Sequence, residues 1–167
     1  MKKKILFEGK AKKIFSSSKP HTLIQHFKDD ATAFNNKKKA VIPGKGIINN
    51  FISELLMSKL SQLNIPNHFI KRINMREQLI KKAEIFPIEF IVRNIATGSL
   101  TKRLGISEGT VLEKPLLEYC FKKDELNDPI ISKEHIFSFG WASEKDIKII
   151  DYFFRLLLKI ILIFLVW

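Results

Sequence analysis

Cysteine is almost absent from this 167-residue sequence, in which Cys120 is the only one. A lone cysteine cannot form an intramolecular disulfide, and no cluster of cysteines and histidines has the spacing of a zinc site. The sequence has four histidines, which do not have the spacing of metal ligands: His21, His26, His68 and His135. We expect each of them to be structural or exposed, and we expect no metal-binding residues. This composition fits a reducing compartment, and we expect a cytoplasmic location.

Long apolar runs are missing as well. The basic amino terminus is followed by a short apolar stretch over residues 5–7, which Glu8 ends, so we expect no secretion signal. Residues 160–167 are uninterrupted apolar, whereas a transmembrane helix needs about twenty such residues. We therefore expect no membrane partner, and binding of this last segment at a lipid surface is the alternative that stays open.

Acidic residues are few, 17 against 29 lysines and arginines, and the formal net charge is +12. A field of this sign attracts phosphorylated metabolites, nucleic acids or anionic lipids, and charge alone does not choose among them. The lysines are scattered, and a run such as Lys37, Lys38 and Lys39 is typical of a solvated surface. We expect a globular chain without a nucleic-acid partner, because 46% of it is hydrophobic and fourteen residues are Phe.

The hydrophobic pattern predicts a β-rich amino-terminal half. Residues 4–15 are expected to form a hairpin with its turn at Gly9, and residues 22–27 a further strand of an antiparallel meander. Further strands are predicted over three segments: 68–73, 78–82 and 87–93.

Apolar spacing of three and four residues predicts a long helix between residues 44 and 64. Its apolar positions are expected to face the core: Ile48, Phe51, Ile52, Leu55, Leu56, Leu60 and Leu63. A short helix over residues 99–104 is predicted to close at Gly105, and Ser143 with Asp146 resembles a capping box that starts another helix at Glu144.

Two segments favour anion binding. The Gly-Lys-Ala-Lys sequence at residues 9–12 would bring backbone amides and two ammonium groups close to a phosphate, but a glycine turn with exposed lysines is more often an ordinary hairpin turn. Arg93, Gly98 and Ser99 lie where a strand leads into a short helix, and they offer a guanidinium fork, backbone amides and a hydroxyl. The alternative there is a capped helix with a surface arginine.

A third candidate is the charged loop that contains Lys122, Lys123, Asp124, Asp128 and Pro129. Mixed charges of this kind suit a site for a nucleotide and an amino-acid substrate, and a polar surface loop explains them equally well.

Six motifs occur in the order found in phosphoribosylaminoimidazole-succinocarboxamide synthase, the SAICAR synthetase family: residues 8–12, 45–50, 87–94, 98–105, 127–129 and 139–141. The resemblance implies a two-lobed α+β fold, similar to the ATP-grasp fold, with an antiparallel β-rich first lobe and an incomplete second lobe. On this resemblance we expect the first lobe over 1–85, the start of the second over 86–150, and a hydrophobic tail over 151–167.

The resemblance also implies roles for residues at matching positions. The ATP site would comprise Gly9, Lys10, Ala11, Lys12, Ile14, Lys81, Lys82, Ile85 and Lys122. The substrate site would comprise Arg93, Gly98, Ser99 and Asp128, and the residues closest to the chemistry would be Lys12, Lys122, Arg93 and Asp128.

The implied reaction joins L-aspartate to an aminoimidazole carboxylate ribotide, with ATP and Mg²⁺, through an acyl phosphate. After about Asp151 the family pattern of Asp-Phe-Lys, Glu-Phe-Gly and metal-holding carboxylates is missing, which is typical of truncation or a changed reading frame. The open alternatives are therefore an inactive remnant and a basic, non-enzymatic anion-binding protein. A homo-oligomer is also left open.

Overall fold

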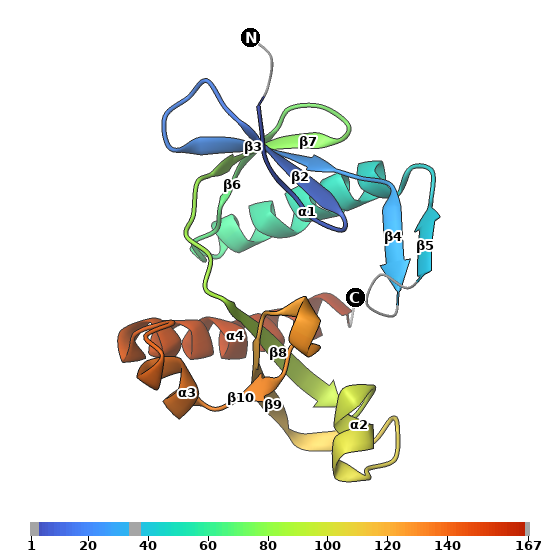
Figure 1. Ribbon diagram of the computed structural model, residues 1–167, viewed down its shortest axis with the longest axis vertical. Helices are drawn as coiled ribbons and strands as arrows, with labels where there is room; N and C mark the ends of the chain where they lie inside the picture. Colours follow the sequence, from blue (N-terminus) through green and yellow to red (C-terminus); the bar gives the residue numbers. More distant parts are fainter. Residues whose placement is uncertain (1–3, 34–37, 166–167) are drawn as a thin grey trace. The chain divides into compact units, whose positions relative to one another are not determined.

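The computed structural model of the chain describes residues 4–33 and 38–165; Lys37 and residues 166–167 of the expected tail lie outside the described residues. The chain forms two compact units, Met1–Glu84 (unit 1) and Ile85–Trp167 (unit 2). Each unit has its own antiparallel sheet and its own long helix (Figure 1).

Unit 1 is built on a five-stranded antiparallel sheet in the order β1-β2-β3-β7-β6. The predicted meander is confirmed as β1 (Ile5–Glu8), β2 (Lys12–Ser16) and β3 (Thr22–Phe27), with the tight turn between β1 and β2 at Gly9. The strands β6 (Phe69–Arg72) and β7 (Glu77–Lys81) complete the sheet, also as predicted.

A separate hairpin, β4 (Asp30–Ala33) and β5 (Lys38–Val41), follows β3 directly. The sequence-based prediction missed it, because Asp30 and its polar neighbours are typical of a loop. The hairpin leads into the helix α1 (Lys45–Gln62), whose bounds agree with the prediction.

The start of α1 is attached to the sheet by a carboxylate that is distant in sequence. Asp29 accepts hydrogen bonds from the amides of Gly46 (2.8 Å) and Gly44 (3.3 Å) and from both terminal nitrogens of Arg76 (2.7 and 2.8 Å). The first amides of a helix have no partner within the helix, so this carboxylate satisfies them and also suits the positive end of the helix dipole.

The apolar stripe of α1 faces away from the sheet, so the prediction that it faces the core is wrong. Ile48 is 60% exposed and Leu55 is 58% exposed, whereas the buried residues of the helix are Gly46 and Asn50. A Cβ on Gly46 would lie 2.5 Å from the carbonyl oxygen of Phe27. At its start the helix therefore approaches the sheet so closely that position 46 has no room for a side chain. Six of the seven predicted core positions are exposed, and the seventh, Leu60, is half-buried.

Unit 2 contains a three-stranded antiparallel sheet in the order β10-β9-β8. The strands are β8 (Ile88–Ile95), β9 (Val111–Phe121) and the short β10 (Ile130–Ile131). The helix α2 (Ser99–Leu104) lies in the connection from β8 to β9 and closes at Gly105, as predicted, and a 3₁₀ turn (Asp124–Leu126) follows β9.

The helices α3 (Lys133–Ser138) and α4 (Glu144–Leu165) supply the rest of the unit 2 core. The core comprises Ile88, Tyr119, Ile136, Ala142 and Ile147. Tyr119 donates to Asp151 (2.6 Å), which also accepts from Lys133 (2.5 Å), so one carboxylate joins β9, α3 and α4. Burial raises the pKa of Tyr119 to about 12 and keeps the phenol protonated as this donor.

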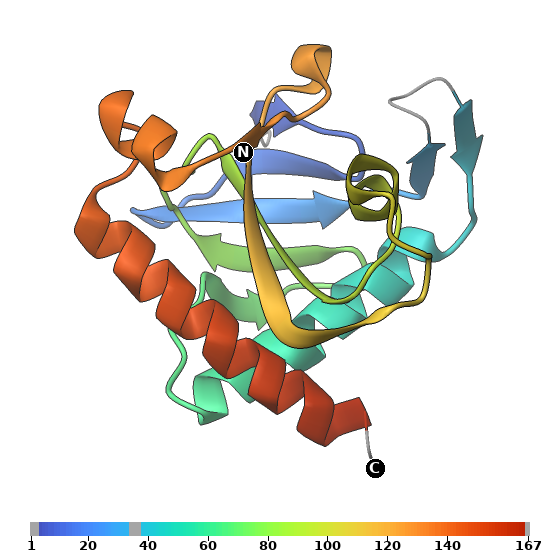
Figure 2. The same ribbon diagram turned by 90° about the horizontal axis from the view of Figure 1, so that it is seen from below.

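The helix α4, red in Figure 2, begins at the predicted capping box. The Ser143 amide donates to Asp146 (3.0 Å), and the Asp146 amide donates back to the Ser143 hydroxyl (3.2 Å). Of the helices in the described part of the chain, none combines the length and the apolar character that crossing a bilayer requires.

Replacing Gly46 by alanine tests the close approach of α1. An alanine in a helix normally stabilises relative to glycine, but here the methyl group meets Phe27 and Arg76, so we expect the free energy of unfolding to fall by about 1–3 kcal/mol. Urea-induced unfolding measures this change in the free energy of unfolding. Lys59→Ala in the last turn is the control, expected to change stability by less than about 0.5 kcal/mol. An unchanged or higher midpoint for Gly46→Ala would contradict the close packing.

Acid should weaken unit 1 through Asp29. The Arg76 guanidinium and the two amides hold the pKa of this carboxyl far below its usual range. Because the pKa of Asp29 is lower in the folded state than in the unfolded state, its ionised carboxylate stabilises the fold. This stabilisation is complete at pH values above the pKa in the unfolded state, about 4, and is lost as the pH falls below that value. We expect Asp29→Asn to lower the melting temperature at pH 7 and to show a smaller further loss at pH 3 than the wild type. Parallel losses in both proteins would rule out this role, and Glu113→Gln serves as the charge-matched control.

Candidate functional site

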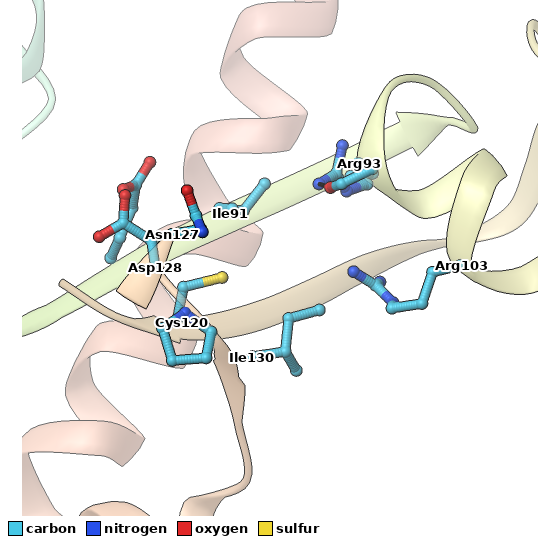
Figure 3. A pocket seen from close by; sticks show the side chains of 10 residues that line it. Ile91, Arg93, Arg103, Cys120, Asn127, Asp128 and Ile130 are labelled. Carbon is cyan, nitrogen blue, oxygen red and sulfur yellow. Dashed lines mark hydrogen bonds between the residues drawn. The ribbon is translucent and has the colours of Figure 1, made fainter. Parts of the chain in front are cut away.

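A pocket in unit 2 collects several of the residues predicted to bind a substrate. The cavity has a volume of about 370 Å³ and is lined by Glu89, Ile91, Arg93, Ser99, Arg103, Cys120, Asn127, Asp128, Pro129 and Ile130. Figure 3 shows the two arginines toward one end and Asn127 with Asp128 toward the other. Three predicted substrate residues, Arg93, Ser99 and Asp128, therefore share one cavity.

The pocket lies against one face of the β8–β9 ribbon. Glu89, Ile91 and Arg93 alternate along β8 and so point to the same side of the sheet. In the antiparallel register Glu89 pairs with Cys120 and Ile91 pairs with Glu118, which places these β9 residues on that side too. Strand pairing thus gives the pocket a rigid wall with charged groups.

Arg93 is held by three partners. Its Nε donates to Glu118 (2.7 Å), one terminal nitrogen donates to the carbonyl of Thr97 (3.3 Å), and the other donates to the hydroxyl of Ser99 (3.1 Å). A guanidinium has five N–H groups, so one on each terminal nitrogen is left for a ligand. Arg93 is only 13% exposed, and these contacts give its fork a defined orientation.

Gly98 makes the turn that presents Ser99. Its φ of 58° lies in the region that favours glycine, and its carbonyl accepts from the Thr101 hydroxyl (2.8 Å). Gly98 does not line the pocket itself. Its role in substrate binding stays a prediction.

Asp128 closes the other end of the pocket from a strained loop. Asn127 and Asp128 both have positive φ, 56° and 46°, which asparagine and aspartate tolerate better than most residues. The Asp128 carboxylate accepts from the Lys123 amide (2.7 Å). This bond orders the loop that brings the acidic side chain to the cavity.

The Cys120 thiol lines the pocket but is not suited to nucleophilic chemistry. Its side chain is buried, and this burial, with carboxylates nearby, raises the pKa of the thiol above its usual value. The thiol therefore stays protonated near neutral pH, whereas a reactive cysteine needs a thiolate.

The hairpin between β1 and β2 forms a second site, in unit 1. A cavity of about 210 Å³ is lined by Lys10, Ala11, Asp30, Ala31 and Lys45. Backbone bonds close the turn, from Gly9 to the Lys12 carbonyl and from Lys28 to the Ala11 carbonyl (both 2.9 Å). Lys28 bridges Glu8 (2.8 Å) and Asp30 (2.5 Å), which ties the hairpin to the start of β4.

Lys12 and Ile14 lie outside this cavity, on one face of β2. The Lys12 ammonium lies 5.2 Å from the centroid of the Phe27 ring. Desolvation lowers the pKa of Lys12. Desolvation also lowers the pKa of His68, and repulsion from the Lys12 charge lowers it further. Lys12 is thus a cation in a partly apolar environment, where a phosphate would gain more from it than in water.

The remaining predicted ATP residues lie apart from both cavities. Lys81 ends β7, while Lys82 and Ile85 are exposed in the segment that joins the units, with Ile85 87% exposed. Lys122 follows β9 and pairs with Glu89 of the pocket wall at 3.6 Å. These positions stay predictions as nucleotide contacts.

The described residues do not assemble a site for Mg²⁺. Over residues 4–33 and 38–165 the structure has no group of three or more His, Cys, Asp or Glu side chains that could hold a metal ion. The donor set does not fit a metal site built by the protein alone.

Sequence reasoning missed Glu118, Arg103 and Asn127. The strand β9 was not predicted, so Glu118 had no assigned partner, although the register of β8 against β9 places it diagonally from Arg93. The one available signal was the glutamate within a run of Leu116, Leu117 and Tyr119, since a charged residue in an apolar run usually has a buried partner.

Comparison with known proteins identifies close similarities. The sequence profile of SAICAR synthetase matches residues 5–161. The chain is 62% identical over 149 residues to the phosphoribosylaminoimidazole-succinocarboxamide synthase of Pelagibacter ubique, covering 89% of the chain and 57% of that protein. It is 61% identical over 142 residues to that of Rhodospirillum centenum, covering 85% and 56%. The chain thus spans a little over half the length of these curated relatives.

Solved structures of SAICAR synthetases resemble this chain in fold as well as in sequence. The crystal structure of the Ehrlichia chaffeensis synthase is 49% identical with a TM-score of 0.86, covering 89% of this chain and 63% of that one. A SAICAR synthetase in complex with ADP is 40% identical with a TM-score of 0.82, covering 87% and 62%. The expected fold class, α+β with an incomplete second lobe, is confirmed.

Asp128 should control the order of its loop. We expect Asp128→Ala to speed hydrogen exchange of the Lys123 amide, because that amide loses the nearer of its two acceptors and keeps only the Phe121 carbonyl (2.9 Å), while Asp128→Asn keeps a side-chain acceptor oxygen and changes the rate little. Amide exchange followed by NMR measures both variants, and equal rates in Asp128→Ala and wild type would show that the carboxylate does not hold the loop.

Proposed function

As the chain belongs to the SAICAR synthetase family, we propose that it acts in the ATP-dependent ligation of L-aspartate to an aminoimidazole carboxylate ribotide. The observation that carries this proposal is the 370 Å³ pocket, in which Arg93 and Arg103 lie at one end and Asp128 at the other (Figure 3), with the Ser99 hydroxyl hydrogen-bonded to Arg93. This ribotide has an anionic phosphate, hydroxyl groups on the ribose, and an amino group and a carboxylate on the imidazole. The two arginines of the pocket are complementary to the phosphate, and the acidic side chains at the other end are complementary to the hydroxyl and amino groups.

The ribotide phosphate would bind at the arginine end. Arg93 keeps one N–H on each terminal nitrogen, and a planar fork of this kind suits a phosphate or a carboxylate. Ser99, which accepts from Arg93, has its hydroxyl proton left to donate. Asp128 and Glu89 would accept from hydroxyl or amino groups of the ligand.

ATP would bind at the hairpin of unit 1. Lys10 and Lys45 line the smaller cavity, Lys12 lies in partly apolar surroundings, and a similar SAICAR synthetase has been solved with ADP. The lysines would attract the phosphates, and the amides of the turn would approach them closely. We place the adenine beside Lys81, Lys82 and Ile85, and Ile14 beneath the hairpin as an apolar contact.

The chemistry needs activation of a carboxylate, because a carboxylate resists attack by an amine. Phosphoryl transfer to it would create an acyl phosphate, and the aspartate nitrogen would then displace phosphate. In this scheme Lys12 in unit 1 and Lys122 in unit 2 each neutralise phosphate charge, while Arg93 holds the ribotide in place. Since the described residues do not form a metal site, we assign no step to Mg²⁺. ATP and L-aspartate are cytoplasmic metabolites, and the proposal includes that location.

Two substitutions separate the two binding sites. We expect Arg93→Ala to weaken ribotide binding by roughly tenfold to a hundredfold and to leave ADP binding unchanged, because the lost hydrogen bonds are charge-assisted. Lys12→Ala should weaken ADP binding and leave ribotide binding unchanged. Isothermal titration calorimetry on the 167-residue chain measures both ligands.

The control for Lys12→Ala is Lys13→Ala. It removes the same charge from the adjacent residue, whose side chain points to the opposite face of β2. Absence of ribotide and ADP binding by the wild-type chain, or equal effects of the two lysine substitutions, would contradict the proposed sites.

A further inference from the structure

Glu118 contacts both arginines of the unit 2 pocket without lining the pocket itself. One carboxylate oxygen accepts from Nε of Arg93 (2.7 Å), and the other accepts from a terminal nitrogen of Arg103. Glu118 is only 9% exposed. A buried carboxylate is costly unless its charge is paired, and these two arginines supply the pairing.

The shared carboxylate also keeps two like charges together. Two guanidinium groups this close would repel each other, and Glu118 between them leaves the cluster with a net charge of +1, since two positive charges meet one negative charge. Arg93 and Arg103 lie on different elements, β8 and α2. Without the carboxylate nothing in the described contacts would fix Arg103 relative to Arg93.

Arg103 has N–H groups that its contact with Glu118 does not use. Among the described contacts it has a single hydrogen bond, to Glu118, and its side chain is 35% exposed on the pocket wall. Arg93 keeps one N–H on each terminal nitrogen. Together the two forks offer more donors than one arginine can, in a geometry that suits the three oxygens of a phosphate monoester.

We propose that Glu118 is a positioning residue and that Arg103 is a second anion-binding residue, so that Arg93 and Arg103 hold one phosphate group together. The inference rests on the proposed function, which supplies the ribotide as the phosphate-bearing ligand. Glu118 acts only through the arginines and does not touch the ligand.

The effect of Glu118→Gln on ligand affinity tests the positioning role, because positioning and charge predict changes of opposite sign. Glu118→Gln makes the chain more positive by one charge, so a purely electrostatic effect would tighten anion binding. Positioning predicts the opposite, a rise of roughly tenfold or more in the dissociation constant for the aminoimidazole carboxylate ribotide. Glu113→Gln makes the same charge change at an exposed position of β9 and should have no effect. Equal or tighter binding by Glu118→Gln overturns the proposal.

A second pair tests Arg103. Arg103→Gln and Lys102→Gln each remove one positive charge from α2, and only the first should weaken ribotide binding by a similar factor. Circular dichroism and an ADP titration accompany each variant. If Glu118→Gln does not fold, Glu118→Asp, which keeps the charge on a shorter side chain, takes its place and should bind more weakly than wild type. Unchanged binding by Arg103→Gln overturns the proposal.

Inorganic phosphate separates this inference from the proposed function. NMR signals of the Arg93 and Arg103 Nε–H groups should shift with phosphate in the wild type and not in Glu118→Gln. If these shifts occur but the ribotide does not bind, the proposed substrate is wrong and the positioning role stands. If neither ligand binds the wild type, both are wrong.

Discussion

The carboxylate of Asp29 receives four hydrogen bonds, and the arrangement of unit 1 depends on them. Two come from Arg76, just before β7, and two from the amides of Gly44 and Gly46 at the start of α1. Asp29 itself follows β3, so one side chain joins the central strands of the sheet to the helix. The next residue, Asp30, begins β4 and lines the same cavity as Lys10.

Unit 2 uses the same physical device twice. Asp151 accepts from Tyr119 and Lys133, which ties α4 to the sheet and to α3. Glu118 accepts from Arg93 and Arg103, which ties α2 to the β8–β9 ribbon. In each case a partly or fully buried carboxylate is satisfied by donors from separate elements, and removal of one partner would leave a charge uncompensated. The first network stabilises the core, and the second shapes the pocket.

Much of the secondary structure could be predicted from local patterns, because its causes are local. The first hairpin turns at Gly9, Gly105 ends α2, and Ser143 with Asp146 caps α4. The hairpin β4–β5 and the strand β9 were missed, since their pairing partners, not their own propensities, make them strands. In the candidate site, too, local patterns were predicted from the sequence and contacts between strands were missed. Arg93 and Ser99 are close in sequence and were found together, whereas Glu118 depends on a partner strand.

The sequence alone determined that residues 45–62 form a helix, since apolar spacing and a flanking proline act within a few residues. It did not determine which face is buried. That choice depends on how near the helix can come to Phe27, which a residue without a side chain at position 46 allows. Likewise, the sequence contains two arginines and a glutamate that are distant along the chain. Only the antiparallel register of β8 and β9, with α2 folded beside them, makes them one cluster, because hydrogen bonds act over a few ångströms in space regardless of sequence separation.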